Sequence, residues 1–261
     1  MNLLFVGDVV GQSGRRVLLN NIGALRDRLK LDLVVVNAEN AAGGFGITEK
    51  IAKEFLAHEI DVLSTGNHVW DKKETLDFIG NDPRLLRPHN YPAGTPGSGW
   101  FVAHTAGGDP VGVLNVMGNV FMQPILDCPF VCTDRVLAGK PAEVKMVLVD
   151  FHAETTSEKM AMGWFLDGRV SAMVGTHTHV PTADERILPG GTAYISDTGM
   201  TGCYDSVIGM DREKVLKRFV QKLPERFEAA EGRGTLCGVL IAIDEKTGKS
   251  SAIQRISIRE E

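Results

Sequence analysis

The chain has 261 residues, of which 43% are hydrophobic and 23% are charged, and its formal net charge is −5 at pH 7. This size and composition are typical of a globular protein with a substantial core, and the negative charge argues against bulk binding to nucleic acid or to an anionic membrane. No apolar run approaches the ~20 residues that span a bilayer, so no membrane association is expected.

The first part of the chain alternates short apolar runs with amphipathic segments. Apolar runs at residues 3–6, 33–36 and 61–64 predict three buried strands. Ser13 is placed to cap a helix after the first strand, and Thr48 is placed to cap a helix after the second. The order strand, helix, strand, helix, strand predicts an α/β fold with a parallel sheet.

The remainder of the chain is less regular. Further strands are predicted over residues 100–104, 111–116, 144–149, 170–174, 193–196, 236–243 and 253–258, and a helix over residues 157–166. Residues 119–143 contain prolines and scattered aromatic residues without clean periodicity, so we expect an irregular, cap-like excursion there. No repeat, low-complexity tract or linker divides the sequence, and we expect a single domain over residues 1–261.

The N-terminal segment and the cysteines indicate the compartment. The N-terminus has no basic region and reaches Asp8 after seven residues, so it reads as a first strand and not as a signal peptide. The chain has four cysteines, none of them in a Cys-x-x-Cys pair. A chain of this size needs no disulfide to fold, so we expect reduced thiols and a cytoplasmic protein.

Residues of the types that bind metals follow several of the predicted strands. The segment Gly175-Thr176-His177-Thr178-His179 comes just after an apolar run, and imidazole is the commonest side-chain ligand of transition metals. The other candidates, each at the end of an apolar run, are Asp8, Glu39, Asn40, Asn67, His68 and His152. Each has a structural alternative, such as a turn acid or a core histidine. Their joint occurrence at five strand ends instead indicates one site, because ligands bind at the carboxyl ends of strands in open α/β sheets.

Carboxylate, amide and imidazole groups together predict a dinuclear hydrolytic site. Two cations about 3.5–4 Å apart need a bridging carboxylate, further oxygen and nitrogen ligands and open positions for water. The bridging water loses its proton readily, and the resulting hydroxide can attack a phosphorus atom in line. His68, beside Asn67, is expected to face the site without binding metal, where it could stabilise the phosphate charge or protonate the leaving oxygen.

These motifs resemble the calcineurin-like metallophosphoesterases over most of the chain. The resemblance rests on Gly7-Asp8, Gly66-Asn67-His68, His152 and Gly175-Thr176-His177-Thr178-His179. Two features depart from the family pattern: the histidine that usually follows the first aspartate is missing, and Asn37-Ala38-Glu39-Asn40 replaces the segment with the bridging aspartate. The combination is similar to the YmdB-like bacterial branch, whose members are described as cyclic-nucleotide or 2′,3′-cyclic phosphodiesterases.

The resemblance implies a fold and a set of metal ligands. The fold is a four-layer α/β/β/α sandwich, and Glu39 would bridge two metal ions. One site would be completed by Asp8, Asn40 and His179, and the other by Asn67, His152 and His177. The mixed ligands leave iron, manganese and zinc as candidate metals.

The expected function is a metal-dependent phosphodiesterase that acts on small phosphodiesters, in particular 2′,3′-cyclic or 3′,5′-cyclic nucleotides. RNA ends are a further class of substrate that this chemistry permits. The alternatives are another dinuclear hydrolase, such as a phosphomonoesterase or an amidohydrolase, and a regulatory metalloprotein that senses a nucleotide and turns it over slowly. The aromatic residues Phe121 and Phe130 favour packing or an oligomer contact over base stacking, and a homo-oligomer is expected.

Overall fold

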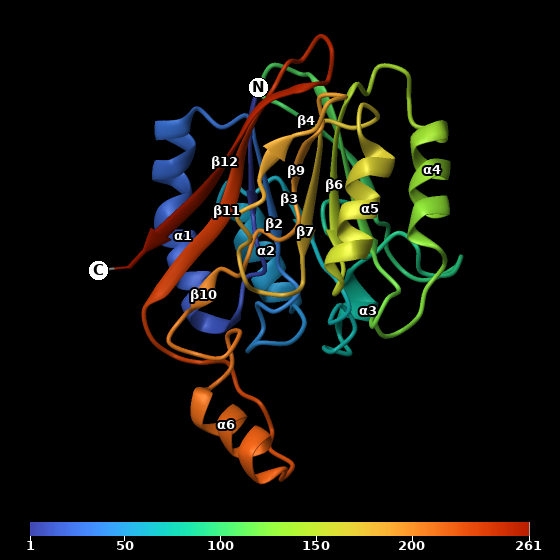
Figure 1. Cartoon of the computed structure of the whole chain (residues 1–261). Helices are drawn as coiled ribbons and strands as arrows, with labels where there is room; N and C mark the ends of the chain where they lie inside the picture. The colour runs from blue at the N-terminus through green and yellow to red at the C-terminus, as the bar shows by residue number, and fades with distance from the viewer. Residues whose placement is uncertain (261) are drawn as a thin grey trace.

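Two six-stranded sheets organise the computed structural model, which describes residues 1–260 (Figure 1). The first sheet consists of β1 (Asn2–Val6), β2 (Leu33–Asn37), β3 (Val62–Ser64), β10 (Gly202–Cys203), β11 (Gly234–Ile243) and β12 (Ser250–Arg259). Its order is β10-β11-β1-β2-β3, with β12 paired to β11. Strands β1, β2 and β3 are parallel, and β11 is antiparallel to β1.

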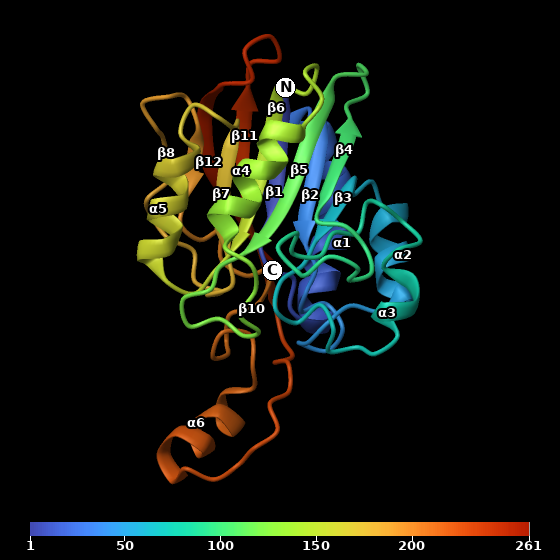
Figure 2. The ribbon, with the colours of Figure 1, turned by 90° about the vertical axis from the view of Figure 1, so that its right-hand side faces the viewer.

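The second sheet has the same mixed character. It consists of β4 (Trp100–His104), β5 (Pro110–Met117), β6 (Met146–His152), β7 (Ala172–Thr176), β8 (Arg186–Ile187) and β9 (Ala193–Ile195). Strands β5, β6, β7 and β9 are parallel, whereas β4 and β8 are antiparallel to their neighbours. The parallel strands of both sheets run toward the same end of the molecule, as the arrowheads of β2 and β5 show (Figure 2).

Helices lie along both sheets, and one projects from the body. The helices are α1 (Gly11–Leu29), α2 (Glu49–Ala57), α3 (Thr75–Phe78), α4 (Pro129–Gly139), α5 (Thr156–Leu166) and α6 (Arg212–Gln221). Helices α1 and α2 lie beside the first sheet and α4 and α5 beside the second, while α6 projects beyond the end at which β2 and β5 terminate (Figure 2). In the described part of the chain, no helix has the length and hydropathy that would carry it across a bilayer.

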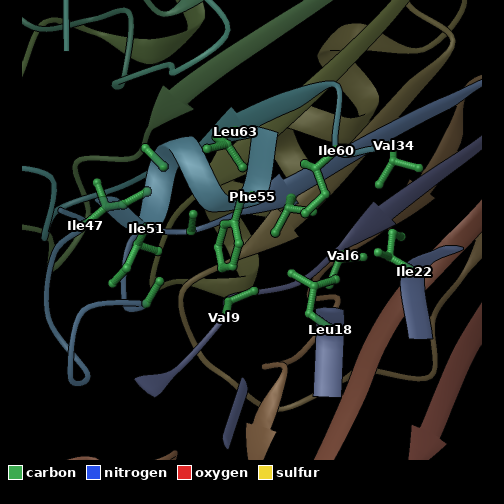
Figure 3. Packing of buried hydrophobic residues seen from close by; sticks show 14 of the residues in the cluster. Val6, Val9, Leu18, Ile22, Val34, Ile47, Ile51, Phe55, Ile60 and Leu63 are labelled. Atoms are coloured by element: carbon green, nitrogen blue, oxygen red, sulfur yellow. The ribbon is translucent and has the colours of Figure 1, made fainter. Parts of the chain in front are cut away.

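Alternation along the strands divides the core. In β1, Leu4 and Val6 belong to a cluster with Leu18 and Phe55 from the helices (Figure 3), because alternate residues of a strand face opposite sides. The intervening residues Leu3 and Phe5 belong to a second cluster together with Val113 and Leu148 from the other sheet. A third cluster joins Val147 and Val149 to Met162 of α5. Burial of each large side chain stabilises the fold by about 1.5–3 kcal/mol.

The strands predicted from the sequence are all present, with their ends shifted by a few residues at most. The helix predicted over residues 157–166 is α5, and the last two strands form the predicted antiparallel hairpin. Thr48 caps α2, since its side chain accepts a hydrogen bond from the amide of Ile51. Mixed α/β architecture is therefore confirmed.

Two local predictions were wrong or incomplete. Ser13 does not cap α1, which begins at Gly11; Ser13 is buried in the helix, and its hydroxyl donates to the carbonyl of Gly232 at 3.0 Å. Residues 119–143 are not irregular throughout, because they contain α4, whose Phe130 packs against Phe165. The amphipathic pattern of α4 is weak because only Pro129 and Thr133 of the helix are buried.

Candidate metal centre

The carboxyl ends of strands from both sheets meet at one end of the molecule. The first sheet supplies four of the predicted ligands from the loops after β1, β2 and β3: Asp8, Glu39, Asn40 and Asn67. The second sheet supplies His152, the last residue of β6, and His177 and His179 from the loop after β7. Parallel register between β6 and β7 places His152 opposite Thr176 and brings the three imidazoles to the same edge.

The first group of ligand atoms gathers around His152. Atoms of Glu39, His152 and His177 all lie within 4.8 Å of one another. The Nε2 atom of His152 lies 3.1 Å from Oε1 of Glu39 and 3.1 Å from Nδ1 of His177. Oδ1 of Asn67 lies 2.9 Å from the same nitrogen. These four residues thus present nitrogen and oxygen atoms to one point.

The second group shares Glu39 with the first. Atoms of Asp8, Glu39 and His179 all lie within 4.8 Å of one another. The side-chain nitrogen Nδ2 of Asn40 lies 3.0 Å from Nε2 of His179 and 3.3 Å from Oε1 of Glu39. Every ligand predicted from the sequence therefore lies in or beside one of two groups, and Glu39 stands between them.

Burial leaves some polar atoms of this cluster without partners. Asp8, Glu39, Asn40 and His152 are all at most 1% exposed. Within residues 1–260, Oδ1 of Asp8 and Oδ1 of Asn40 have no hydrogen-bond partner, although a buried polar atom without a partner is costly. A free carboxylate oxygen of Asp8 and a free amide oxygen of Asn40, both buried beside Glu39, fit a hard or borderline cation.

The protonation states also suit metal binding. Burial, followed by the charge of His152, lowers the pKa of His177 to about 3, so its imidazole is neutral and can act as a ligand. Burial raises the pKa of Asp8, which shows that its carboxylate is poorly solvated. Burial alone would raise the pKa of Glu39, but the neighbouring His152 lowers it. A bound cation would favour the ionised form of both carboxylates.

Glycine is required where the chain passes under the ligands. A Cβ atom on Gly66 would lie 2.3 Å from Nε2 of His152 and 2.4 Å from Oε2 of Glu39. Both distances are shorter than any normal contact, so a side chain there would displace the ligands. This explains why Asn67 and His68 are preceded by a glycine.

His152 is oriented by a buried network that the sequence analysis missed. The hydroxyl of Thr176 donates to Oδ1 of Asp150 at 2.7 Å, and its oxygen lies 2.9 Å from Nδ1 of His152. Because the hydroxyl hydrogen is used by Asp150, the oxygen accepts the Nδ1 proton, and the ring is held with Nε2 directed toward Glu39. Asp150 also accepts hydrogen bonds from Ser64 and Asn37 of the first sheet. The network depends on sheet-to-sheet packing, which has no local sequence signal.

A second buried group holds the loop that carries His177 and His179. These two residues have positive φ angles of 100° and 66°, a conformation that is strained for residues with a side chain. Between them, Thr178 donates to Oδ2 of Asp197 through its amide at 3.1 Å and its hydroxyl at 2.7 Å. Lys159 donates to the same oxygen at 2.7 Å. The buried Asp197 carboxylate thus holds this loop in place.

His68 lies at the rim of the cluster. Its Nδ1 atom lies 2.8 Å from Oδ2 of Asp71, its ring packs edge-on against Phe45, and its amide donates to Oε2 of Glu39. A cavity of about 380 Å³ opens beside it, and its polar side is lined by Glu39, Asn40, His68, Glu154, His177, Thr178 and His179. The Asp71 contact, three residues after His68, is a local pairing that sequence reasoning missed.

Comparisons with known proteins place the chain among similar proteins. A family model described as YmdB-like protein matches residues 4–256. The chain is 50% identical over its full length, and over 98% of the relative, to a Bacillus subtilis protein named 2′,3′-cyclic-nucleotide 2′-phosphodiesterase. It is 34% identical, over its full length and 94% of the relative, to a Mycoplasma pneumoniae protein named putative phosphatase/phosphodiesterase. A crystal structure titled as a novel phosphatase from Mycoplasma pneumoniae superposes with a TM-score of 0.94 at 35% identity, covering 100% of this chain and 94% of the other.

Proposed function

Because the chain belongs to the YmdB-like protein family, we propose that it hydrolyses phosphodiesters at the metal centre formed by the two sheets. Family membership confirms the resemblance seen in the sequence. The observation that carries the proposal is the pair of ligand groups that share Glu39. Two ligand groups with one common carboxylate match the needs of two-metal hydrolysis. The name of the Bacillus relative supports a cyclic nucleotide as substrate.

The ligands are assigned by their positions around Glu39. We assign Asp8, Glu39, Asn40 and His179 to one metal ion and Glu39, Asn67, His152 and His177 to the other. Oxygen and imidazole ligands together suit iron, manganese or zinc. Bound metals would supply activation of a water molecule and stabilisation of charge on the phosphate oxygens.

The remaining residues prepare the site for that chemistry. Thr176 and Asp150 hold Nε2 of His152 toward the ligand cluster, and Asp197 holds the loop that carries His177. His68 is placed at the cavity to stabilise the phosphate or to protonate the leaving oxygen, and Asp71 fixes the orientation of its ring. His68 is the assigned catalytic side chain.

The cavity favours a diester over a monoester. A phosphomonoester carries an additional negative charge, which enzymes usually balance with cationic side chains. The residues that line this cavity include neither lysine nor arginine, and Glu154 adds a negative charge at its edge. A cyclic diester of a nucleotide, either 2′,3′-cyclic or 3′,5′-cyclic, is therefore the better electrostatic match.

The architecture supports the same assignment. We propose that the two sheets and their flanking helices form the four-layer α/β/β/α sandwich of metallophosphoesterases and act as one domain. Three apolar clusters support this, since one lies between the sheets and the others lie between each sheet and its helices. The metal ligands then come from the two inner layers, which must pack correctly for the site to form.

A side-by-side assay tests the proposed activity. With added Mn²⁺ at about neutral pH, we expect bis-p-nitrophenyl phosphate and 2′,3′-cyclic nucleotides to be hydrolysed with higher kcat/KM than p-nitrophenyl phosphate. Asp8→Asn is the control for contaminating enzymes, because it removes a charged ligand while keeping the side-chain shape. A clear preference for the monoester would overturn the phosphodiesterase assignment.

A further inference from the structure

One wall of the cavity beside the ligands is apolar. That wall is lined by Phe45, Val207, Ile208, Met210, Phe219 and Phe227. The chemistry assigned to the site does not use any of these side chains. We propose that this apolar wall binds the nucleobase of the substrate by stacking and apolar contact, without reading the hydrogen-bonding edge of the base. The inference rests on the proposed phosphodiesterase function.

The two kinds of lining suit the two parts of a nucleotide. Glu39, Asn40 and His179 belong to the polar lining, where a phosphate would meet the metal ligands. The apolar lining offers three phenylalanine rings and aliphatic side chains. The volume of about 380 Å³ falls within the ~300–1,000 Å³ range of small-molecule sites. A phosphate bound at the ligands would therefore direct the rest of the nucleotide toward the apolar wall.

Most of the wall comes from one projecting segment. Residues 204–230 leave the body at the end where the ligands lie and include α6, which Figure 2 shows in orange below the sheets. Val215 packs with Val10 and Met200, so the segment is anchored on the body. The carbonyl oxygen of Ile208 lies 2.8 Å from Nδ1 of His179, which couples the wall directly to a metal ligand.

The exposure of two side chains of the wall indicates a binding surface. Phe219 is 64% exposed and Ile208 is 52% exposed although both line the cavity. A side chain that served only the core would be buried. Every nucleobase has an apolar π face that can cover such a ring. By contrast, neither Phe121 nor Phe130 lines this cavity.

The composition of the wall determines its selectivity. Apart from the weakly accepting sulfur of Met210, its side chains carry no hydrogen-bond donor or acceptor, so they read little of the base edge. Apolar contact increases with buried area, so a purine should bind better than a pyrimidine. We therefore expect adenine and guanine esters to have similar KM values, with cytosine and uracil esters weaker.

Phe219→Ala tests the wall with little risk to folding, because the ring is largely exposed. We expect KM for 2′,3′-cyclic AMP to rise about 5- to 10-fold, the lower part of the range for replacement of an aromatic side chain under a base, with a smaller effect on kcat. The wild-type enzyme should have a lower KM for the nucleotide than for a base-free ribose 2,3-cyclic phosphate. The substitution should reduce the difference between these two KM values. Val220→Ala is the matched control, since Val220 is 76% exposed and lies outside the cavity lining.

The assay separates the two proposals. If the wild-type enzyme hydrolyses the cyclic nucleotide but Phe219→Ala and Phe227→Ala both retain its KM, the wall does not bind the base and the phosphodiesterase function stands. If Phe219→Ala raised KM by the same factor for the nucleotide and for the base-free ester, the inference would also be overturned. If the wild-type enzyme hydrolyses neither ester, both proposals fail. Calorimetric titration with 3′-AMP provides a readout without turnover, and weaker binding to Phe219→Ala than to Val220→Ala is the supporting result.

Discussion

The ammonium group of Lys159 lies 2.7 Å from Oδ2 of Asp197, and both side chains are almost completely buried beneath the loop of His177 and His179. The same carboxylate accepts two hydrogen bonds from Thr178. An ion pair between α5 and the segment after β9 therefore holds two proposed metal ligands in a strained backbone conformation. This pair is a structural support for the site and does not contact the cavity.

Removal of Lys159 should weaken both the fold and the site. Lys159→Met leaves a buried carboxylate without its counter-charge, and we expect the free energy of unfolding to fall by about 3–5 kcal/mol in urea titrations. Lys53→Met is the matched control because Lys53 pairs with Glu49 on the surface, where such a pair contributes less than about 1 kcal/mol. Equal effects of the two substitutions would contradict the supporting role of Lys159.

Gly66→Ala should disrupt the metal centre directly. The added methyl group would meet His152 and Glu39 at 2.3–2.4 Å, so the ligands must move. We expect both metal ions to be lost, as measured by elemental analysis of the purified protein, together with activity. Gly23→Ala in α1 is the control: a Cβ there meets nothing within 4 Å, and alanine should stabilise the helix by about 0.5–1 kcal/mol. Normal metal content in Gly66→Ala would show that the crowding is relieved elsewhere.

His68 should affect turnover more than metal binding. We expect His68→Ala to retain both metal ions and to lower kcat by about 10²–10⁴-fold, the usual contribution of a positioned acid or base. Asp71→Asn should have a smaller effect, about 10-fold on kcat with little change in KM, because it alters only the orientation of the imidazole. Asp71→Glu should recover part of the rate. Loss of metal from His68→Ala would make His68 a ligand instead.

Glu39 should be needed for stabilisation by metal. A ligand that binds only the folded state at 100 times its Kd stabilises it by about 2.7 kcal/mol, which for a chain of this length corresponds to a rise in Tm of about 5–10 °C. We expect Mn²⁺ to produce such a rise in metal-depleted wild-type protein and little rise in Glu39→Gln. Glu143→Gln, at an exposed position, is the control. If Mn²⁺ raised the Tm of Glu39→Gln as much as that of the wild type, Glu39 would not be a shared ligand of the two metal ions.

Local pattern was sufficient for the elements that carry the candidate ligands. Apolar runs followed by Asp8, by Glu39 and Asn40, and by His152 predicted both the strands and the polar residues at their ends. A buried strand and the loop that follows it are both encoded by residues that are close together in the sequence. A single sequence is therefore enough to predict them. The sequence analysis missed α6, although Asp211 caps it and its apolar residues recur at helical spacing; most of these residues are exposed and are not required by the core.

The sequence by itself determined the α/β class, the order of the strands along the chain and the kinds of ligand available at their ends. Only the tertiary structure decided which atoms meet. The contacts of Asp150 with Thr176, of Lys159 with Asp197 and of Ile208 with His179 join residues 26 to 38 positions apart. Such contacts arise from the pairing of neighbouring strands and from the packing of one helix or loop against another. No periodicity within a short window encodes that packing, so neither the support of the ligands nor the apolar wall of the cavity could be read from the chain alone.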